Sequence, residues 1–344
     1  MFEDSNLNFL IILFSYIIVF FVINSFLINK KILLDSYQSS KHKKLISNQN
    51  VPLSGGLVLL LSIFFFKLED SLLNYILILI IYLIGLLSDL RILNNPLKRL
   101  ILQLLVISSY IYINKINISY INILYFDNLL SNNFISLIFT LFCFLILVNG
   151  SNFIDGSNLQ CTGYYIAVII TLGILINNGL LFQNQFQVKV IFVFMISFAI
   201  LNIYNKSFLG DGGSYLLSFV VGIISVKFFN LNSVSPYFIA LLLWYPAFEN
   251  LFTIIRRKFF NKKTIDQPDV QHLHQLFIKT LRKKNYKTFV LKNIFGFIVF
   301  IFNFILFLVG SMYLYSSKIQ ILLIIFAVTI YILTYQKLKI FKSK

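Results

Sequence analysis

Long uninterrupted runs of apolar residues dominate this 344-residue chain and restrict what it can fold into. Hydrophobic residues make up 58% of the chain and charged residues only 12%, whereas about a quarter of a typical soluble domain is charged. Runs of roughly 15–20 apolar residues can cross a bilayer as helices. The sequence therefore predicts an all-α, polytopic membrane helical bundle in which residues 1–344 form a single membrane-embedded domain.

Eleven of these runs are candidates for transmembrane helices. They lie near residues 9–28, 52–66, 71–88, 100–114, 134–149, 163–177, 188–204, 214–229, 236–255, 292–315 and 319–336. Several are short for a hydrocarbon core of about 30 Å, so we expect their ends to extend into the flanking polar residues. Any one of them could instead be re-entrant.

The distribution of Lys and Arg predicts the orientation of the spans. With the N-terminus outside, the inner segments hold 24 of the 29 Lys and Arg residues, within the ranges 29–50, 89–99, 203–213, 256–292 and 337–344. Cytoplasmic loops carry an excess of these residues, so we expect an outer N-terminus and a cytoplasmic C-terminus. The net charge of +17 then follows mainly from topology, and no soluble basic domain suggests nucleic-acid binding.

Four acidic side chains stand where structure alone would not place them: Asp89, Asp155, Asp211 and Glu249 lie at or just beyond the ends of apolar runs. A carboxylate at the rim of a bilayer is costly unless it is paired, metal-bound or facing water. The predicted topology places all four on one membrane face. The inner loops that would build a site there are residues 29–50, 89–99, 149–162, 203–213 and 256–291.

Two motifs combine oxygen ligands with glycine. In VNGSNFIDGSNLQ, residues Asn149, Asn152 and Asp155 recur at intervals of three, which places them on one face if the stretch is helical. Carboxylate and amide oxygens suit a hard cation such as Mg²⁺, which also takes water and substrate phosphate. In FLGDGGS, glycines flank Asp211 before Ser214 opens a span, and the free amides of a helix N-terminus favour phosphate.

Cations lie close to these acids. Lys98 and Arg99 follow Asp89 and could contact phosphate or, with that acid, form an ion pair that caps two helices. Arg256 and Arg257 directly follow the 236–255 run and precede a second cluster of candidate functional residues.

That cluster is the motif PDVQHLH, which holds Asp269, His272 and His274. Two histidines at this spacing rarely bind one metal ion from a helix, and no metalloprotease spacing is present. Contacts to phosphate or uridine, or proton transfer, remain open. The third histidine of the chain, His42, lies in a basic run and is expected to be solvated.

In this order and on one face, the clusters resemble those of the polyprenyl-phosphate N-acetylhexosamine-1-phosphate transferases, glycosyltransferase family 4. The resemblance extends from about residue 30 to 280 and is carried mainly by NGSNFIDG, FLGDGGS and PDVQHLH. It implies that undecaprenyl phosphate attacks the β-phosphorus of a UDP-N-acetylamino sugar and releases UMP. The product would start an O-antigen, capsule or wall polymer at the cytoplasmic face of the bacterial inner membrane.

The resemblance also implies roles for individual residues. Asn152 and Asp211 match positions that hold Mg²⁺, with Mn²⁺ as an alternative ion, and Asp89, Asp155, Asp211, His272 and His274 match catalytic positions. The expected substrate-binding residues are Lys98, Arg99, Asn149, Asn158, Gly210, Ser214, Arg256, Arg257 and Asp269. The expected partners are the two substrates and the lipid bilayer, and a homodimer stays open.

Four positions depart from the family pattern: Ser88 replaces the first of two paired acids, Leu159 replaces a usual Gly, Glu249 replaces Asp, and Val51 replaces a usual Thr before Pro52. Eleven spans and a single His-x-His favour the UDP-GlcNAc branch over the related phospho-MurNAc-pentapeptide transferase. A transporter or flippase that couples ions through the rim acids is the competing interpretation. Transport sites, however, lie near the bilayer midplane, whereas these acids lie at the inner rim.

Overall fold

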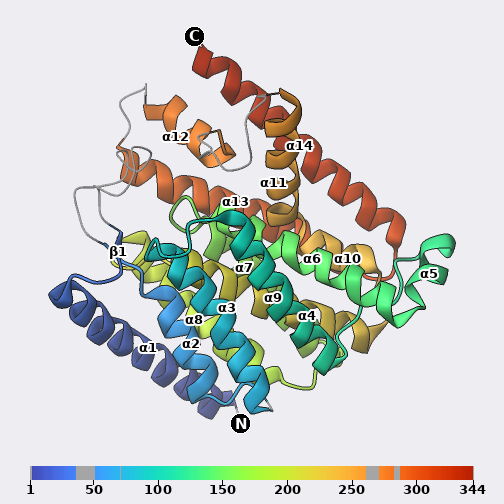
Figure 1. Cartoon of the computed structure of the whole chain (residues 1–344), viewed down its shortest axis with the longest axis horizontal. Helices are drawn as coiled ribbons and strands as arrows, with labels where there is room; N and C mark the ends of the chain where they lie inside the picture. Colours follow the sequence, from blue (N-terminus) through green and yellow to red (C-terminus); the bar gives the residue numbers. More distant parts are fainter. Residues whose placement is uncertain (1, 36–50, 70, 261–270, 283–286, 344) are drawn as a thin grey trace.

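The computed structural model describes residues 2–35, 51–69, 71–260, 271–282 and 287–343, and these residues are almost entirely helical (Figure 1). The helices are α1 (Phe2–Lys30), α2 (Gly55–Phe65), α3 (Leu72–Asp89), α4 (Pro96–Asn114), α5 (Leu124–Leu130), α6 (Asn133–Ile154), α7 (Gln160–Asn177), α8 (Gln185–Ile203), α9 (Gly210–Asn232), α10 (Pro236–Leu242), α11 (Trp244–Ile255), α12 (Leu273–Arg282), α13 (Thr288–Met312) and α14 (Ser317–Ser343). Strand β1 (Leu34–Asp35) pairs antiparallel with β2 (Val51–Pro52). A π-helical turn, Arg256–Phe260, continues α11.

The helices account for the apolar runs of the sequence. Among the described residues, nine helices are long and apolar enough to cross a membrane, and α10 and α11 would make a tenth although they are bent by 74°. The eleventh run is α2, whose 11 residues would rise about 16 Å, roughly half of a bilayer core. The predicted all-α, multi-pass membrane bundle is confirmed, and the spans extend into flanking polar residues as expected.

Helices α7 and α9 form the centre of the bundle, whereas α1 and α14 lie at its periphery. In the most apolar stretch of each helix, 78% of the residues of α7 and 83% of those of α9 are buried, compared with 17% in α1 and 17% in α14. Two helices approach α9 closely enough for backbone contact. A Cβ atom on Gly85 of α3 would lie 2.4 Å from Gly212, and one on Gly56 of α2 would lie 2.5 Å from Gly213. The glycines of FLGDGGS therefore serve helix packing and fix the start of α9 against α2 and α3.

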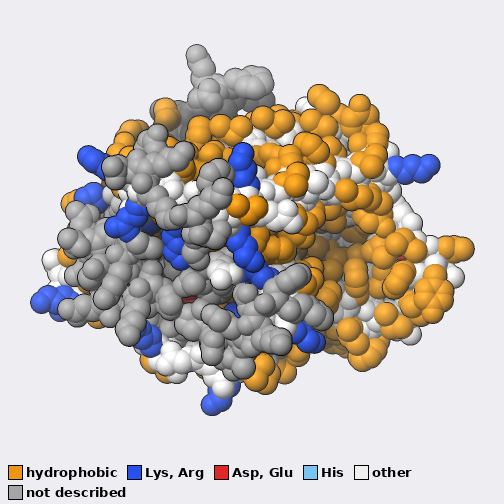
Figure 2. Space-filling view, turned by 90° about the horizontal axis from the view of Figure 1, so that it is seen from above, with side chains coloured by type: hydrophobic (Ala, Val, Ile, Leu, Met, Phe, Trp, Pro, Cys, Tyr) orange, Lys and Arg blue, Asp and Glu red, His pale blue; other side chains and the backbone are white. Residues whose placement is uncertain are grey.

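The helix ends that carry the predicted clusters meet at one end of the bundle. There α3 and α6 end while α4, α7, α9 and α13 begin, and hydrogen bonds connect α3 to α9 and the α6–α7 turn to α13. Figure 2 looks onto this end, with Lys and Arg side chains over its left part and a hollow lined by hydrophobic side chains at its right. At the opposite end, the short helix α5 lies in the connection between α4 and α6.

Candidate active site

The start of α9 is held by a carboxylate from α3. Asp89 accepts a hydrogen bond from the Asp211 N–H at 3.0 Å and another from the Gly212 N–H at 3.1 Å, one on each carboxylate oxygen. The first amides of a helix lack partners within the helix, and the helix dipole favours negative charge there. Gly210 has φ +75°, and a Cβ atom on it would lie 2.7 Å from Asp89. The local fold thus requires glycine at 210 and gives Asp89 a capping role.

Asp211 points into a polar cluster with Ser88 and Arg99. The Ser88 hydroxyl donates to Asp211 Oδ2 at 2.7 Å, and Arg99 Nη1 lies 3.3 Å from the same oxygen and also donates to Ser88 Oγ. The Arg99 and Asp211 side chains keep 21% and 29% of their exposure, so water and a polar substrate can reach them. Ser88, where the family pattern has an acid, joins the cation to the carboxylate.

Asn152 contacts the first turn of α9, next to Asp211, through Ser214 and Tyr215. Ser214 Oγ donates to the Asp211 carbonyl at 3.1 Å and to Asn152 Oδ1 at 3.5 Å, and Asn152 Nδ2 donates to Tyr215 OH at 3.4 Å. No group of three or more His, Cys, Asp or Glu side chains suited to a metal occurs in the described part of the chain. One carboxylate and one amide oxygen do fit Mg²⁺ that takes its remaining ligands from substrate phosphates and water.

The two histidines lie on the other side of the α6–α7 turn. Their rings stack with centroids 5.8 Å apart and an interplanar angle of 7°, and the His272 ring lies 5.4 Å from Phe153. A Cβ atom on Gly156 would lie 2.0 Å from His274 Nε2, so this ring rests directly on the turn that follows Asp155. Since Phe153 follows Asn152, the end of α6 connects the histidines with the start of α9.

Glu249 of α11 is the partner of His272. Its Oε1 lies 2.9 Å from His272 Nδ1, and its Oε2 accepts a hydrogen bond from Tyr331 of α14. Only 1% of Glu249 is exposed. Glu249 therefore holds His272 in place. From the sequence alone, an ion pair of Glu249 with Arg256 or Arg257 would be equally plausible.

The remaining predicted residues occupy several environments. Asn149 donates to Gln103 of α4, and buried Asn158 donates to Asn205 and Asn293, which holds the α6–α7 turn against α8 and α13. Asp155 is the residue at the C-terminal cap of α6.

The predicted cations also differ in their surroundings. Arg256 is buried, donates to Gln271 and lies over the rings of Phe252 and Tyr335. Arg257 is buried and Lys98 is exposed. Asp269 lies outside the described residues.

Sequence reasoning missed two contributors, the Ser88 bridge and the Tyr331 donor. Neither residue has a local pattern that marks it, because each acts through a contact with a different helix. Lys292 of α13, counted in the sequence only among loop charges, is buried next to Asn293 in the chain.

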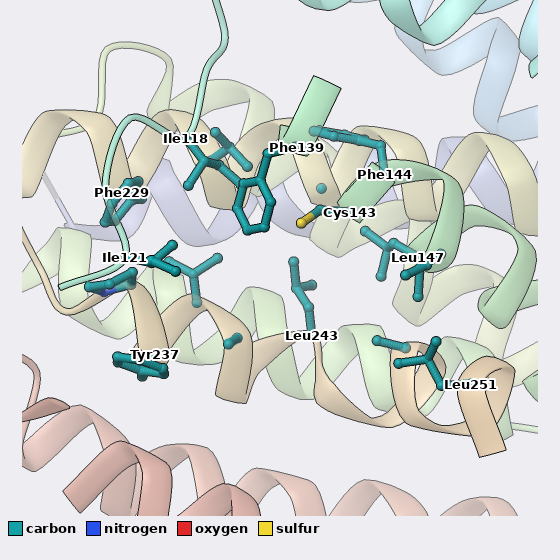
Figure 3. A pocket seen from close by; sticks show the side chains of 17 residues that line it. Ile118, Ile121, Phe139, Cys143, Phe144, Leu147, Phe229, Tyr237, Leu243 and Leu251 are labelled. Atoms are coloured by element: carbon teal, nitrogen blue, oxygen red, sulfur yellow. The ribbon is translucent and has the colours of Figure 1, made fainter. Parts of the chain in front are cut away.

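An apolar cavity of about 350 Å³ lies between α6, α9 and the bent pair α10–α11 (Figure 3). Its lining includes Cys143, Leu147, Leu243 and Leu251, and the side chains around it are almost all hydrophobic. On both α6 and α11 the polar site begins five residues beyond the lining, at Asn152 and Arg256, a rise of about 8 Å along each helix. On α9 the nearest lining residue is Gly222, a rise of about 16 Å from Asp211, so the cavity extends from below the polar end toward the opposite end of the bundle.

Comparison with known proteins supports the resemblance. Residues 71–229 match the family model described as glycosyl transferase family 4. This range contains the Asp89, Arg99, Asn152 and Asp211 clusters, whereas the two histidines lie beyond it. No curated protein matches the chain. The family match supports a membrane-bound transferase.

Proposed function

We propose that this protein transfers a sugar 1-phosphate from a UDP-N-acetylamino sugar to a polyprenyl phosphate, undecaprenyl phosphate in bacteria. The observation that carries the proposal is the convergence of Asp211, Asn152 and Arg99 on the first turn of α9, at one end of a membrane bundle. An oxygen of the lipid phosphate would attack the β-phosphorus of the UDP-sugar. The bond to the UMP oxygen would break, and UMP would leave with its electron pair.

Such a reaction joins two anions, so it depends on charge neutralisation and alignment more than on covalent catalysis. Asp211 and Asn152 would hold Mg²⁺ together with the diphosphate, and the ion would offset negative charge on the phosphates. Arg99, 3.3 Å from Asp211 and partly exposed, is placed to contact a phosphate oxygen at the same turn. His272 and His274 would act on the substrates from the other side of the α6–α7 turn.

The lipid substrate needs an apolar site next to this polar one. The cavity between α6 and α11 meets that need because its lining ends about 8 Å below Asn152 and Arg256. A prenyl chain lying there would present its phosphate to the polar end. The proposal places that end at the cytoplasmic face of the membrane, where a water-soluble UDP-sugar is available.

The test is UMP release by purified protein given Mg²⁺, undecaprenyl phosphate and a panel of UDP-N-acetylamino sugars. We expect UMP with at least one sugar, loss of the signal in Asp211→Asn, and no change in Asp127→Asn, the same substitution in α5 at the opposite end. Absence of UMP with every sugar, together with ion-coupled transport in liposomes, would establish the transporter instead. Full activity of Asp211→Asn would remove this residue as the metal ligand.

A further inference from the structure

The side chains of Tyr331, Glu249 and His272 form a buried chain of hydrogen bonds that the proposed reaction does not by itself require. They come from α14, α11 and the residue just before α12. Each oxygen of the Glu249 carboxylate has one donor, because His272 Nδ1 lies 2.9 Å from Oε1 and the Tyr331 hydroxyl donates to Oε2. A buried carboxylate is costly without such donors, so the three groups stabilise one another.

This arrangement decides which ring nitrogen of His272 carries a proton. A carboxylate only accepts hydrogen bonds, so Nδ1 must be the donor toward Glu249. In a neutral imidazole the other nitrogen, Nε2, is then an acceptor, and in the protonated ring it is a donor. A carboxylate bound to one nitrogen also fixes the tautomer and the ring orientation.

Further contacts of His272 hold its ring plane. The ring stacks on His274 at 7° and packs against Phe153, while its backbone N–H donates to Gln275 at 3.3 Å. On the far side, Tyr331 packs edge-on against the rings of Phe248 and Phe252, with centroids 5.1 and 5.5 Å away. The last helix of the bundle thus reaches the candidate active site through one hydroxyl group.

We propose that Glu249 and Tyr331 are positioning residues that hold His272 with its proton on Nδ1, so that any action of this ring on a substrate phosphate would go through Nε2. The part of this inference that concerns phosphate rests on the proposed function, whereas the proton position does not. Neither residue touches substrate in this assignment. Glu249 acts on His272 directly, and Tyr331 acts by fixing the carboxylate.

The chain has only three histidines, so ring-¹⁵N-histidine NMR of the full-length protein in lipid nanodiscs can resolve each one. His42→Gln and His274→Gln assign the His272 signals. We expect a protonated Nδ1 on His272 in the unaltered protein. In Glu249→Gln, the neutral amide can present either its oxygen or its NH₂ to Nδ1, so His272 should lose its preference for the Nδ1 proton and part of the population should carry the proton on Nε2.

Tyr331→Phe removes only the second donor and should shift the His272 signals less. Tyr335→Phe makes the same change one helical turn further along α14, in a ring that stacks on Tyr331, and should leave them unchanged. In the UMP assay, we expect Glu249→Gln to lower kcat by about 10–100-fold, as loss of a group that orients a functional histidine does, and to change KM for the UDP-sugar little.

Two outcomes would overturn the relay. One is an Nε2-protonated His272 in the unaltered protein, and the other is a His272 spectrum that neither Glu249→Gln nor, where that variant does not fold, Tyr331→Phe changes. Failure of the proposed function appears separately, as absence of UMP while the NMR result stands. If Glu249→Gln does not fold, Tyr331→Phe against Tyr335→Phe still decides the proposal.

Discussion

Replacing Asp89 by Asn would separate the capping role of this acid from a direct role in catalysis. Asn is nearly isosteric, but only one of its two terminal atoms accepts a hydrogen bond. One of the two α9 amides that now lie 3.0 and 3.1 Å from carboxylate oxygens would therefore face an NH₂ group. The substitution also removes the negative charge from the N-terminus of α9.

The expected loss of stability follows from these two changes. A hydrogen bond to a charged group contributes about 1.5–3 kcal/mol, and a charge at a helix terminus about 0.3–1 kcal/mol. Since Asp89 is only half-buried, the lower ends apply, and the total is about 2 kcal/mol. For a large chain this lowers the melting temperature by about 4 °C. Turnover should fall as well, because Asp211 donates one of the affected amides.

The assay is thermal unfolding in detergent, followed by circular dichroism, alongside UMP release. Asp211→Asn is the comparison, because its surface ion pair with Arg99 contributes about 0–1 kcal/mol and its loss should affect activity far more than stability. If Asp89→Asn keeps the melting temperature and loses activity, Asp89 acts on the substrate itself. If Asp89→Asn keeps both the melting temperature and the activity, the capping contribution assigned to Asp89 is wrong.

Two further substitutions test the α6–α7 turn. Gly156→Ala should reduce UMP release sharply, because the new Cβ atom would lie 2.0 Å from His274 Nε2 and displace a buried ring; Gly173→Ala, where nothing lies within 4 Å, should keep full activity. Leu159 has φ +61°, a left-handed conformation that costs an L-residue roughly 1–2 kcal/mol. Leu159→Gly should therefore be more stable to thermal unfolding than Leu159→Ala by about 0.5–1 kcal/mol after the larger entropy cost of glycine, and equal stabilities would contradict the strain.

The fold was predictable because its main cause is local. A run of apolar residues that must satisfy its backbone inside a bilayer can only become a helix or part of a barrel, and these runs have helical length. Helix ends were predictable for the same reason, since Asn152 and Asp155 sit where the apolar run gives way to polar residues. The bend of 74° between α10 and α11 was not predicted, although Pro246 stands in the first turn of α11, because the apolar run continues across the break.

The sequence predicted which residues belong to the site better than it predicted which of them contact one another. Periodicity placed Asn152 and Asp155 on one helix, but which helix faces them depends on contacts such as Gly85 with Gly212. In the sequence, Gly212 stands in FLGDGGS, a motif that indicated phosphate binding and not helix packing. The partner of Glu249 was hidden for a related reason, because Tyr331 lies 82 residues away and nothing local distinguishes it from the other tyrosines.

The surroundings of three acids show why residue type alone assigns too much. Glu249 is almost fully buried and holds His272 and Tyr331, so water-borne phosphate or metal would have to displace both donors to reach it. Each carboxylate oxygen of Asp89 accepts a hydrogen bond from an α9 amide. Asp211 keeps 29% of its side-chain exposure, and the neutral Ser88 beside it adds no second charge. A cation at this site would therefore be bound by one protein charge, so its affinity should depend strongly on the diphosphate of the substrate.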